Sequence, residues 1–137
     1  MRRFVVDAGV VLHLAGDEVE RPSAHKLLAP TLLRSQTLSM LHEAVRRREV
    51  AADVAHERLR RIGRMPIRLL GDAVLRRRAW DIADELGLTS TYDAEYLALT
   101  QLQADAFVTL DAKLARRARA VVTVASIDEL RTRPRRR

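Results

Sequence analysis

Four acidic residues stand in four separate segments of this 137-residue chain: Asp7 in FVVDAGV, Glu43 in SMLHEAVRRR, Asp93 in TSTYDAEYLAL and Asp111 in FVTLDAKLARRA. Asp7 and Asp111 directly follow short apolar runs of the kind that form β-strands. Carboxylate oxygens gathered in one place are suited to a hard divalent cation. The four acids are therefore candidate catalytic and metal-binding residues, with Mg²⁺ or Mn²⁺ as the expected cofactor.

A shared location would give these acids a definite chemistry. Like charges near one sheet edge repel one another unless a cation neutralises them. A bound metal ion lowers the pKa of a water molecule and orients it for attack on a phosphodiester, and a second ion stabilises the leaving oxygen. The chain has no cysteine, which excludes disulfides, thiolate chemistry and cysteine-based zinc sites. His42–Glu43 matches the start of a zinc-protease HExxH motif, but Arg46 occupies the place of the second histidine.

Each acid taken alone also has a purely structural role open to it. Asp7, Asp93 and Asp111 are good helix-start residues, where a cap or a first-turn charge contributes about 1 kcal/mol. Glu43 can pair with a neighbouring arginine on an exposed helix face. Only the joint placement of the four acids separates the two interpretations.

The composition indicates a compact, helix-rich chain with a basic surface. Its net charge is +7, and nearly all of its 25 basic residues are arginine, which is well suited to phosphate. There are two alternative explanations of the high arginine content: the base composition of the genome, and the binding of an acidic protein partner. Because no apolar stretch approaches the length of a membrane span, we expect a cytoplasmic protein with no membrane association. We expect one domain over residues 1–131, followed by a basic tail at 132–137.

Strand and helix patterns alternate along the chain. This alternation predicts a three-layer α/β/α sandwich with a central, mostly parallel sheet, whose working site lies at the carboxyl ends of its strands. The 35–48 segment has Leu38, Leu41 and Val45 as its expected core stripe. The expected strands are 4–6, 31–33, 67–70, 106–110 and 121–124, and the expected helices are 8–15, 21–29, 35–48, 51–62, 73–86, 92–103, 112–119 and 127–131.

Over about residues 3–130, the chain resembles the PIN-domain ribonucleases, and more narrowly the VapC-like toxins of bacterial toxin–antitoxin pairs. The resemblance is carried by VVDAG, by the glutamate of LHEAV, by TYDAEYLALTQLQADAFVTLD and by KLARRA. It implies a metal-dependent endoribonuclease in which the four acids hold Mg²⁺ or Mn²⁺ and Thr109 helps to hold the site. Family members often carry a small hydroxyl residue two places after the first aspartate, where this chain has Gly9.

The resemblance also implies partners. A small antitoxin would wrap the toxin with its C-terminal segment, and the helices at 35–48 and 51–62 would form part of the groove that binds it. In the alternative interpretation, these two helices pack within the domain or form a homodimer face. Arg116 and Arg117 are candidate contacts to the RNA substrate, or else solvated helix charges. The alternative function is an RNA- or protein-binding module of the same fold that does not cleave. DNA cleavage is less favoured, because the chain lacks the inserted segments that capture branched DNA.

Overall fold

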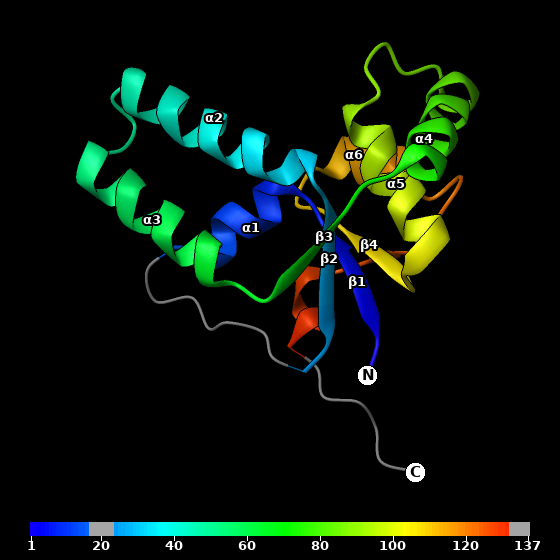
Figure 1. Ribbon diagram of the computed structural model, residues 1–137, viewed down its shortest axis with the longest axis horizontal. Helices are drawn as coiled ribbons and strands as arrows, with labels where there is room; N and C mark the ends of the chain where they lie inside the picture. The colour runs from blue at the N-terminus through cyan, green and yellow to red at the C-terminus, as the bar shows by residue number, and fades with distance from the viewer. Residues whose placement is uncertain (17–23, 132–137) are drawn as a thin grey trace.

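Within residues 1–16 and 24–131, which the computed structural model describes, five strands form one parallel sheet with helices on both sides (Figure 1). The prediction of an α/β sandwich with a parallel central sheet is confirmed. The strands are β1 (Arg3–Val6), β2 (Lys26–Pro30), β3 (Ile67–Leu70), β4 (Ala106–Val108) and β5 (Val124–Ala125). The helices are α1 (Ala8–Leu14), α2 (Leu32–Arg46), α3 (Ala52–Arg64), α4 (Ala73–Leu86), α5 (Tyr92–Gln103), α6 (Ala112–Ala118) and the 3₁₀ helix η1 (Ile127–Leu130).

The strand order is β3-β2-β1-β4-β5, so the direction of winding reverses next to β1. Along the chain, β2 and β3 are added on one side of β1, and β4 and β5 are then added on its other side. In parallel α/β sheets, ligands bind outside the carboxyl ends of the strands at such a reversal. Val6 is paired with Val108 in the β1–β4 register, so the residues that follow these two leave the sheet side by side at that point.

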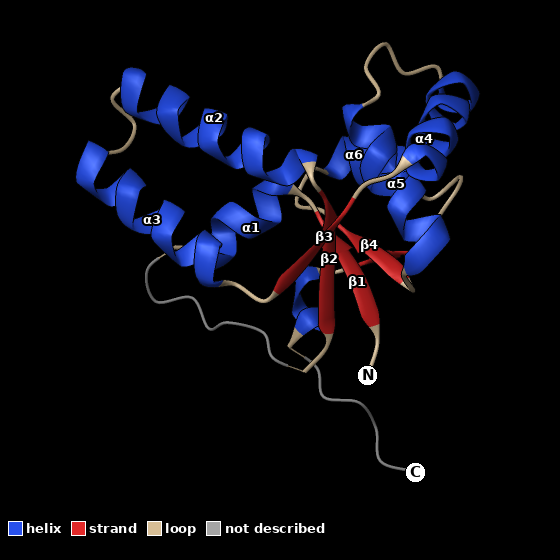
Figure 2. Cartoon of the chain, in the orientation of Figure 1, coloured by secondary structure: helices blue, strands red, loops and turns tan. Residues whose placement is uncertain are grey.

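The helices fall into two groups, which Figure 2 shows on opposite sides of the strands. Helix α5 packs against β1, β2 and β4, and its side chains from Tyr96 to Thr100 are all buried. Helices α2 and α3 run side by side as an arm that extends away from the sheet (Figure 1). The core that holds the elements together consists mainly of valine, leucine and alanine, and none of the helices within the described ranges is long and apolar enough to cross a membrane.

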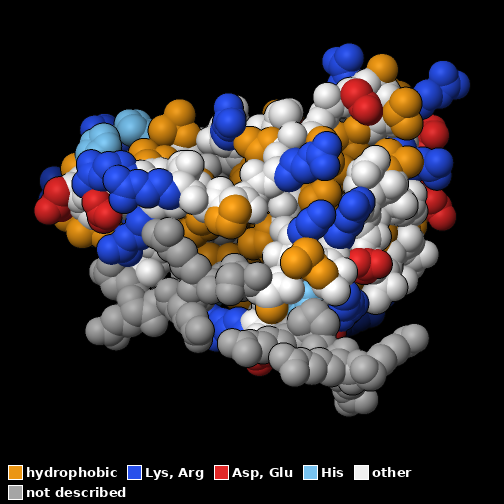
Figure 3. Space-filling model, turned by 60° about the horizontal axis from the view of Figure 1, so that its bottom comes forward, with side chains coloured by type: hydrophobic (Ala, Val, Ile, Leu, Met, Phe, Trp, Pro, Cys, Tyr) orange, Lys and Arg blue, Asp and Glu red, His pale blue; other side chains and the backbone are white. Residues whose placement is uncertain are grey.

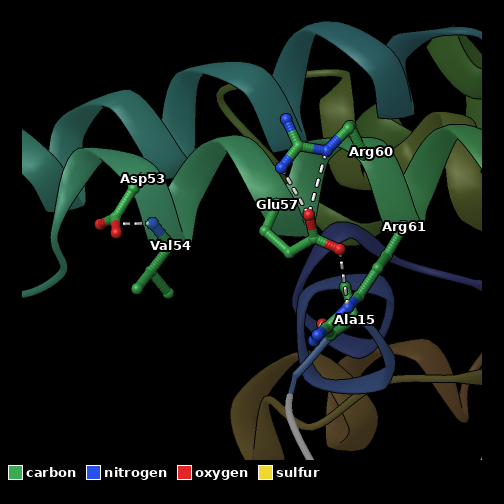
Figure 4. Close-up of polar contacts among 6 residues, drawn as sticks. All are labelled: Ala15, Asp53, Val54, Glu57, Arg60 and Arg61. Atoms are coloured by element: carbon green, nitrogen blue, oxygen red, sulfur yellow. Dashed lines mark hydrogen bonds and ion pairs between the residues drawn. The ribbon is translucent and has the colours of Figure 1, made fainter.

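Polar contacts fix the lower part of this arm (Figure 4). The Arg61 guanidinium donates a hydrogen bond to the Ala15 carbonyl at the end of α1, over 3.1 Å. Glu57 accepts from Arg60 one turn later and forms an ion pair with Arg61 at 3.5 Å. The side chain of Glu57 thus holds Arg61 in position to link α3 to α1.

The structure differs from the sequence prediction around β2. Part of the helix expected at 21–29 lies outside the described residues, but Lys26–Pro30 is a strand, and the strand expected at 31–33 is instead the start of α2. The apolar run at 27–29 is buried between β1 and β3, and backbone pairing on both sides stabilises it as a strand. Short apolar runs of this kind do not distinguish a buried strand from a helix. The predicted tail at 132–137 also lies outside the described residues.

The predicted core stripe of α2 is partly wrong. Leu41 is buried, but Leu38 is 56% exposed, and Leu33 and Thr37 are the other buried residues of the helix. Helix α2 begins three residues earlier than expected, at Leu32, and its inner face is set by contact with β2 and α1.

Elsewhere the structure is close to the prediction. The strand at 67–70 and the helices at 73–86 and 92–103 have the expected bounds. Gly87 ends α4 in the left-handed conformation, with a φ of 67° that glycine adopts without a steric penalty. The strand expected at 106–110 is shorter, ending at Val108, and the last strand is Val124–Ala125 rather than 121–124.

Candidate metal centre

Asp7 and Thr109 meet where β1 and β4 end side by side. Asp7 directly follows β1 and is the N-cap of α1, because its Oδ1 accepts a hydrogen bond of 3.0 Å from the Val10 N–H. The Thr109 hydroxyl donates to Asp7 Oδ2 over 2.5 Å, although 102 residues separate the two. Both carboxylate oxygens of Asp7 are therefore fixed, and the side chain is oriented at the reversal point of the sheet.

Asp93 is brought to the same region by α5. It lies in the first turn of that helix, and the burial of the next turns against the sheet fixes the position of its backbone. Burial raises the pKa of Asp93, the negative charge of Asp111 raises it further, and the positive charge of Arg117 partly offsets both. Asp93 thus lies within electrostatic reach of Asp111, and the surrounding protein displaces part of the water around its carboxyl group although the residue as a whole is exposed.

Asp111 is the N-cap of α6, two residues beyond Thr109. Its Oδ1 accepts hydrogen bonds from the Lys113 and Leu114 N–H groups at 2.9 and 3.1 Å, and its own N–H donates to the Thr109 hydroxyl. Thr109 therefore bridges the loops after β1 and β4, because it contacts both Asp7 and Asp111.

The three aspartates share one electrostatic environment. Burial is the main cause that raises the pKa of Asp7, the bonds from Thr109 and Val10 oppose it, and the charges of Asp93 and Asp111 raise it again. Burial and neighbouring negative charge thus both disfavour the charged forms of Asp7 and Asp93. All of the donors are carboxylate or hydroxyl oxygens, which is the ligand chemistry that Mg²⁺ and Mn²⁺ prefer.

Glu43 is not joined to this group by any described contact. It lies on the exposed outer half of α2, where its Oε1 accepts a hydrogen bond from Ser39 at 3.4 Å, and it lines a recess with Leu12, Arg47 and Arg58. Its charge is not among those that shift the pKa of Asp7 or Asp93. Within residues 1–16 and 24–131, no three or more Asp, Glu, His or Cys side chains form a ready-made metal cage. The role of Glu43 stays a prediction from sequence.

Two further residues lie at the site that the sequence did not indicate. Tyr96, one turn after Asp93, is 1% exposed, and its hydroxyl donates to Gln36 Oε1 on α2 over 2.5 Å. Burial raises the pKa of Tyr96, and the charges of Asp7 and Asp93 raise it further, which places the hydroxyl near both carboxylates. A tyrosine within an apolar helix pattern is typical of an ordinary core residue, so no sequence signal marks it.

The comparisons with known proteins address the fold. No protein-family model matches the chain, and no curated protein matches it. Its structure is similar to the crystal structure of PAE2754 from Pyrobaculum aerophilum, a PIN-domain protein, with a TM-score of 0.72 and 21% sequence identity over 94% of this chain and 93% of that one. The fold is PIN-like. At this identity, the similarity establishes the arrangement of the elements and nothing about the activity.

On the PIN-like fold, position 9 faces the site. A Cβ atom built on Gly9 would lie 3.6 Å from Asp7 Oδ1, an ordinary contact distance, so the backbone leaves room for a small side chain beside the carboxylate. Because glycine has no Cβ, position 9 itself adds no side chain beside the Asp7 carboxylate.

The basic residues surround the site unevenly. Arg117 donates a hydrogen bond to the Leu86 carbonyl at the end of α4, over 2.5 Å, and its charge reaches Asp93. Arg116 is exposed on the same helix. Lys and Arg side chains lie in several separate groups on the face shown in Figure 3, with apolar and acidic side chains between them. Arg117 is the described arginine whose charge shifts the pKa of a site aspartate, Asp93.

Proposed function

We propose that this protein is a metal-dependent endoribonuclease that hydrolyses RNA phosphodiesters, and that it acts as the toxin of a type II toxin–antitoxin pair. One observation carries the proposal: Asp7 and Thr109 are hydrogen-bonded across the reversal point of a PIN-like sheet, with Asp93 and Asp111 acting electrostatically on Asp7. A cluster of negative charge at the location where such sheets bind ligands is the expected arrangement for a divalent cation.

The proposed roles follow from the geometry. Asp7 and Asp93 would be the direct ligands of Mg²⁺ or Mn²⁺, as the resemblance implies, and burial raises the pKa of both carboxyl groups. Asp111 would contribute through its second carboxylate oxygen, since Oδ1 is occupied by the start of α6. Glu43 is the fourth acid that the sequence predicts, but its described partner is Ser39 and no role in this site is assigned to it from the geometry. When bound, the metal ion would lower the pKa of a water molecule and neutralise charge on the scissile phosphate.

The remaining residues position the acids and hold RNA. Thr109 orients the Asp7 carboxylate, and the first N–H groups of α6 orient the Asp111 carboxylate, so that neither has to be ordered when RNA binds. Arg117 places a positive charge beside Asp93 and is available for a phosphate of the backbone. Arg116, on the adjacent exposed face of α6, would extend the same contact.

We further propose two protein partners. A cognate antitoxin would bind in the groove between α2 and α3, which is lined by Leu33, Leu38, Leu59 and Ile62. The chain would also form a homodimer. Both proposals rest on the resemblance to VapC-like toxins. Co-purification with a small protein encoded by an adjoining gene tests the first, and the mass of the purified protein in sedimentation tests the second.

The second candidate function is an RNA- or protein-binding module that does not cleave. The position of Glu43 favours this second function, because the described contacts do not join Glu43 to the three aspartates. Such a module would use the same basic groups without a catalytic metal ion.

A cleavage assay distinguishes the two functions. The purified protein is incubated with a pool of structured RNA in Mg²⁺ or Mn²⁺, with EDTA as the metal-free control. We expect cleavage that requires metal and is lost in Asp7→Asn and Asp93→Asn, while Asp128→Asn, a matched change in η1 far along the chain, retains it. RNA binding that persists without any cleavage would favour the binding module.

Growth of cells that express the protein gives an independent readout. We expect growth arrest with the wild-type protein and its relief by Asp93→Asn, because that change removes a proposed ligand. Equal toxicity of the two proteins would contradict a catalytic cause of the arrest.

A further inference from the structure

Helix α2 reaches the carboxylate site through Gln36. Its Oε1 accepts the hydrogen bond from the Tyr96 hydroxyl, which joins residues 60 positions apart across the gap between α2 and α5. Tyr96 is almost fully covered, so its hydroxyl has a fixed direction and a fixed partner. Gln36 is itself half-buried, as expected of a side chain that points toward the interior rather than along the surface.

The location of this hydrogen bond connects Gln36 to the aspartates. The Tyr96 hydroxyl lies within electrostatic reach of both Asp7 and Asp93. Helix α2 also begins directly after β2, the neighbour of β1, so its first turns rise from the same sheet edge at which Asp7 lies. Gln36 belongs to those first turns.

Glu43 lies on the same stripe of α2 as Gln36, because residues seven apart on a helix share a face. Those seven residues correspond to about 10 Å along the helix axis. The arm formed by α2 and α3 extends away from the sheet (Figure 1), so the added length carries Glu43 away from the sheet edge. Its described partner is Ser39, on the exposed surface.

We propose that Gln36, rather than Glu43, is the side chain that α2 contributes to the carboxylate site, as a neutral amide oxygen beside three aspartates. This inference rests on the proposed metal-dependent function and refines it. The hydrogen bond from Tyr96 uses one lone pair of the amide oxygen and leaves the second for a metal ion or one of its waters. The site then holds three negative charges instead of four, which reduces repulsion in the metal-free protein and weakens the attraction for a divalent cation.

The change Gln36→Glu tests this charge count. Glutamate keeps an oxygen that accepts the Tyr96 hydrogen bond and adds a fourth carboxylate. We expect the metal-free protein to melt at a lower temperature and the apparent Kd for Mg²⁺ or Mn²⁺, measured by calorimetry or by metal-dependent melting, to tighten about tenfold or more. The matched control is Gln103→Glu, which adds the same charge at the other end of α5, about 15 Å from Asp93 by helical rise.

Glu43→Gln supplies the opposite test. If Gln36 is the contribution of α2, removal of the Glu43 charge leaves the apparent Kd for the metal unchanged within about twofold, a change of under half a kcal/mol. Weakening of the metal affinity by tenfold in Glu43→Gln, together with a Gln36→Glu protein that behaves like Gln103→Glu, would overturn the inference.

A metal-free measurement separates this inference from the proposed function. In EDTA, we expect the loss of melting temperature caused by Gln36→Glu to be smaller in an Asp93→Asn background, because one of the repelling charges is then absent. If the wild-type protein shows no metal-dependent shift but this coupling is present, the proposed function fails while the location of Gln36 stands. If the coupling is absent, Gln36 is not at the site and the inference fails.

Discussion

Asp7 combines two roles that substitution can separate. Its oxygens cap α1 and accept from Thr109, which stabilises the fold, while its negative charge is partly buried beside Asp93 and Asp111, which opposes folding in the absence of metal. Asp7→Asn retains one oxygen for the cap on the Val10 N–H, presents an NH2 group that donates to the Thr109 hydroxyl oxygen instead of accepting from it, and removes the charge. Asparagine is as good an N-cap as aspartate. Asp7→Ala removes the oxygens together with the charge.

The two changes should therefore differ in the metal-free protein. Loss of the cap costs about 1 kcal/mol, and leaving the half-buried Thr109 hydroxyl without its acceptor costs about 1 kcal/mol more. For a chain of 137 residues the entropy of unfolding is about 0.29 kcal/mol per kelvin, so Asp7→Ala should melt about 7 °C below Asp7→Asn, which lacks the same charge but keeps the polar side chain. Asp7→Asn should melt at or above the wild-type temperature, because the repulsion is relieved.

Thermal melting followed by circular dichroism near neutral pH, first in EDTA and then in excess Mg²⁺, measures these effects. Metal at one hundred times its Kd contributes about 2.7 kcal/mol, or about 9 °C for a chain of this size, and we expect this increase in the wild-type protein but not in Asp7→Asn. The reasoning is refuted if Asp7→Asn loses as much stability as Asp7→Ala in EDTA. That result would mean that the charge of Asp7 stabilises the fold without any metal.

Three further predictions concern pH and packing. In EDTA, the pKa values of Asp7 and Asp93 are raised, so the folded state binds more protons than the unfolded state as pH rises above about 3.8. The contribution of these two groups to the free energy of unfolding should therefore fall as pH rises from about 3.8 through their folded-state pKa values. Urea titrations in EDTA measure this fall, and the same titrations in Mg²⁺ should show a smaller one. Thr109→Val should lower the free energy of unfolding measured in urea by about 1–2 kcal/mol, because Asp7 loses its hydroxyl donor. Thr109→Ser keeps the hydroxyl and should retain most of that free energy. An equal loss in both variants would show that the methyl group of Thr109, and not its hydroxyl, is responsible. Gly87→Ala should lower the free energy of unfolding by about 1 kcal/mol, because the backbone of Gly87 has a positive φ. Gly63→Ala should raise it by about 0.5–1 kcal/mol in the same measurement, because Gly63 lies inside α3 with open space around it.

Much of the fold was predictable because its signals are local. Asp72 and Gly87 mark the two ends of α4, and both act through contacts with their own helix. The apolar runs before Asp7 and Asp111 predicted strands whose carboxyl ends bear acids, and parallel strands place those ends at one edge. The likeness to PIN domains was also readable from these segments, and the fold confirms it at the level of architecture.

The errors occurred where tertiary contacts decide. Residues 26–30 have the pattern of a helix in part, and became a strand only because β1 and β3 supply hydrogen bonds on both sides. Leu38 was expected in the core but is exposed, since the inner face of α2 is chosen by its packing on β2 and α1.

The sequence by itself determined that acids follow two strands and begin a helix, because each of those placements depends on nearby residues alone. Only the tertiary structure decided which side chains share the site. Tyr96 and Gln36 meet because α5 and the first turns of α2 converge above the sheet, and no pattern within either segment encodes that distance. Helix geometry put Gln36 and Glu43 on one face, but the direction in which α2 leaves the sheet placed the amide, and not the acid, in contact with Tyr96.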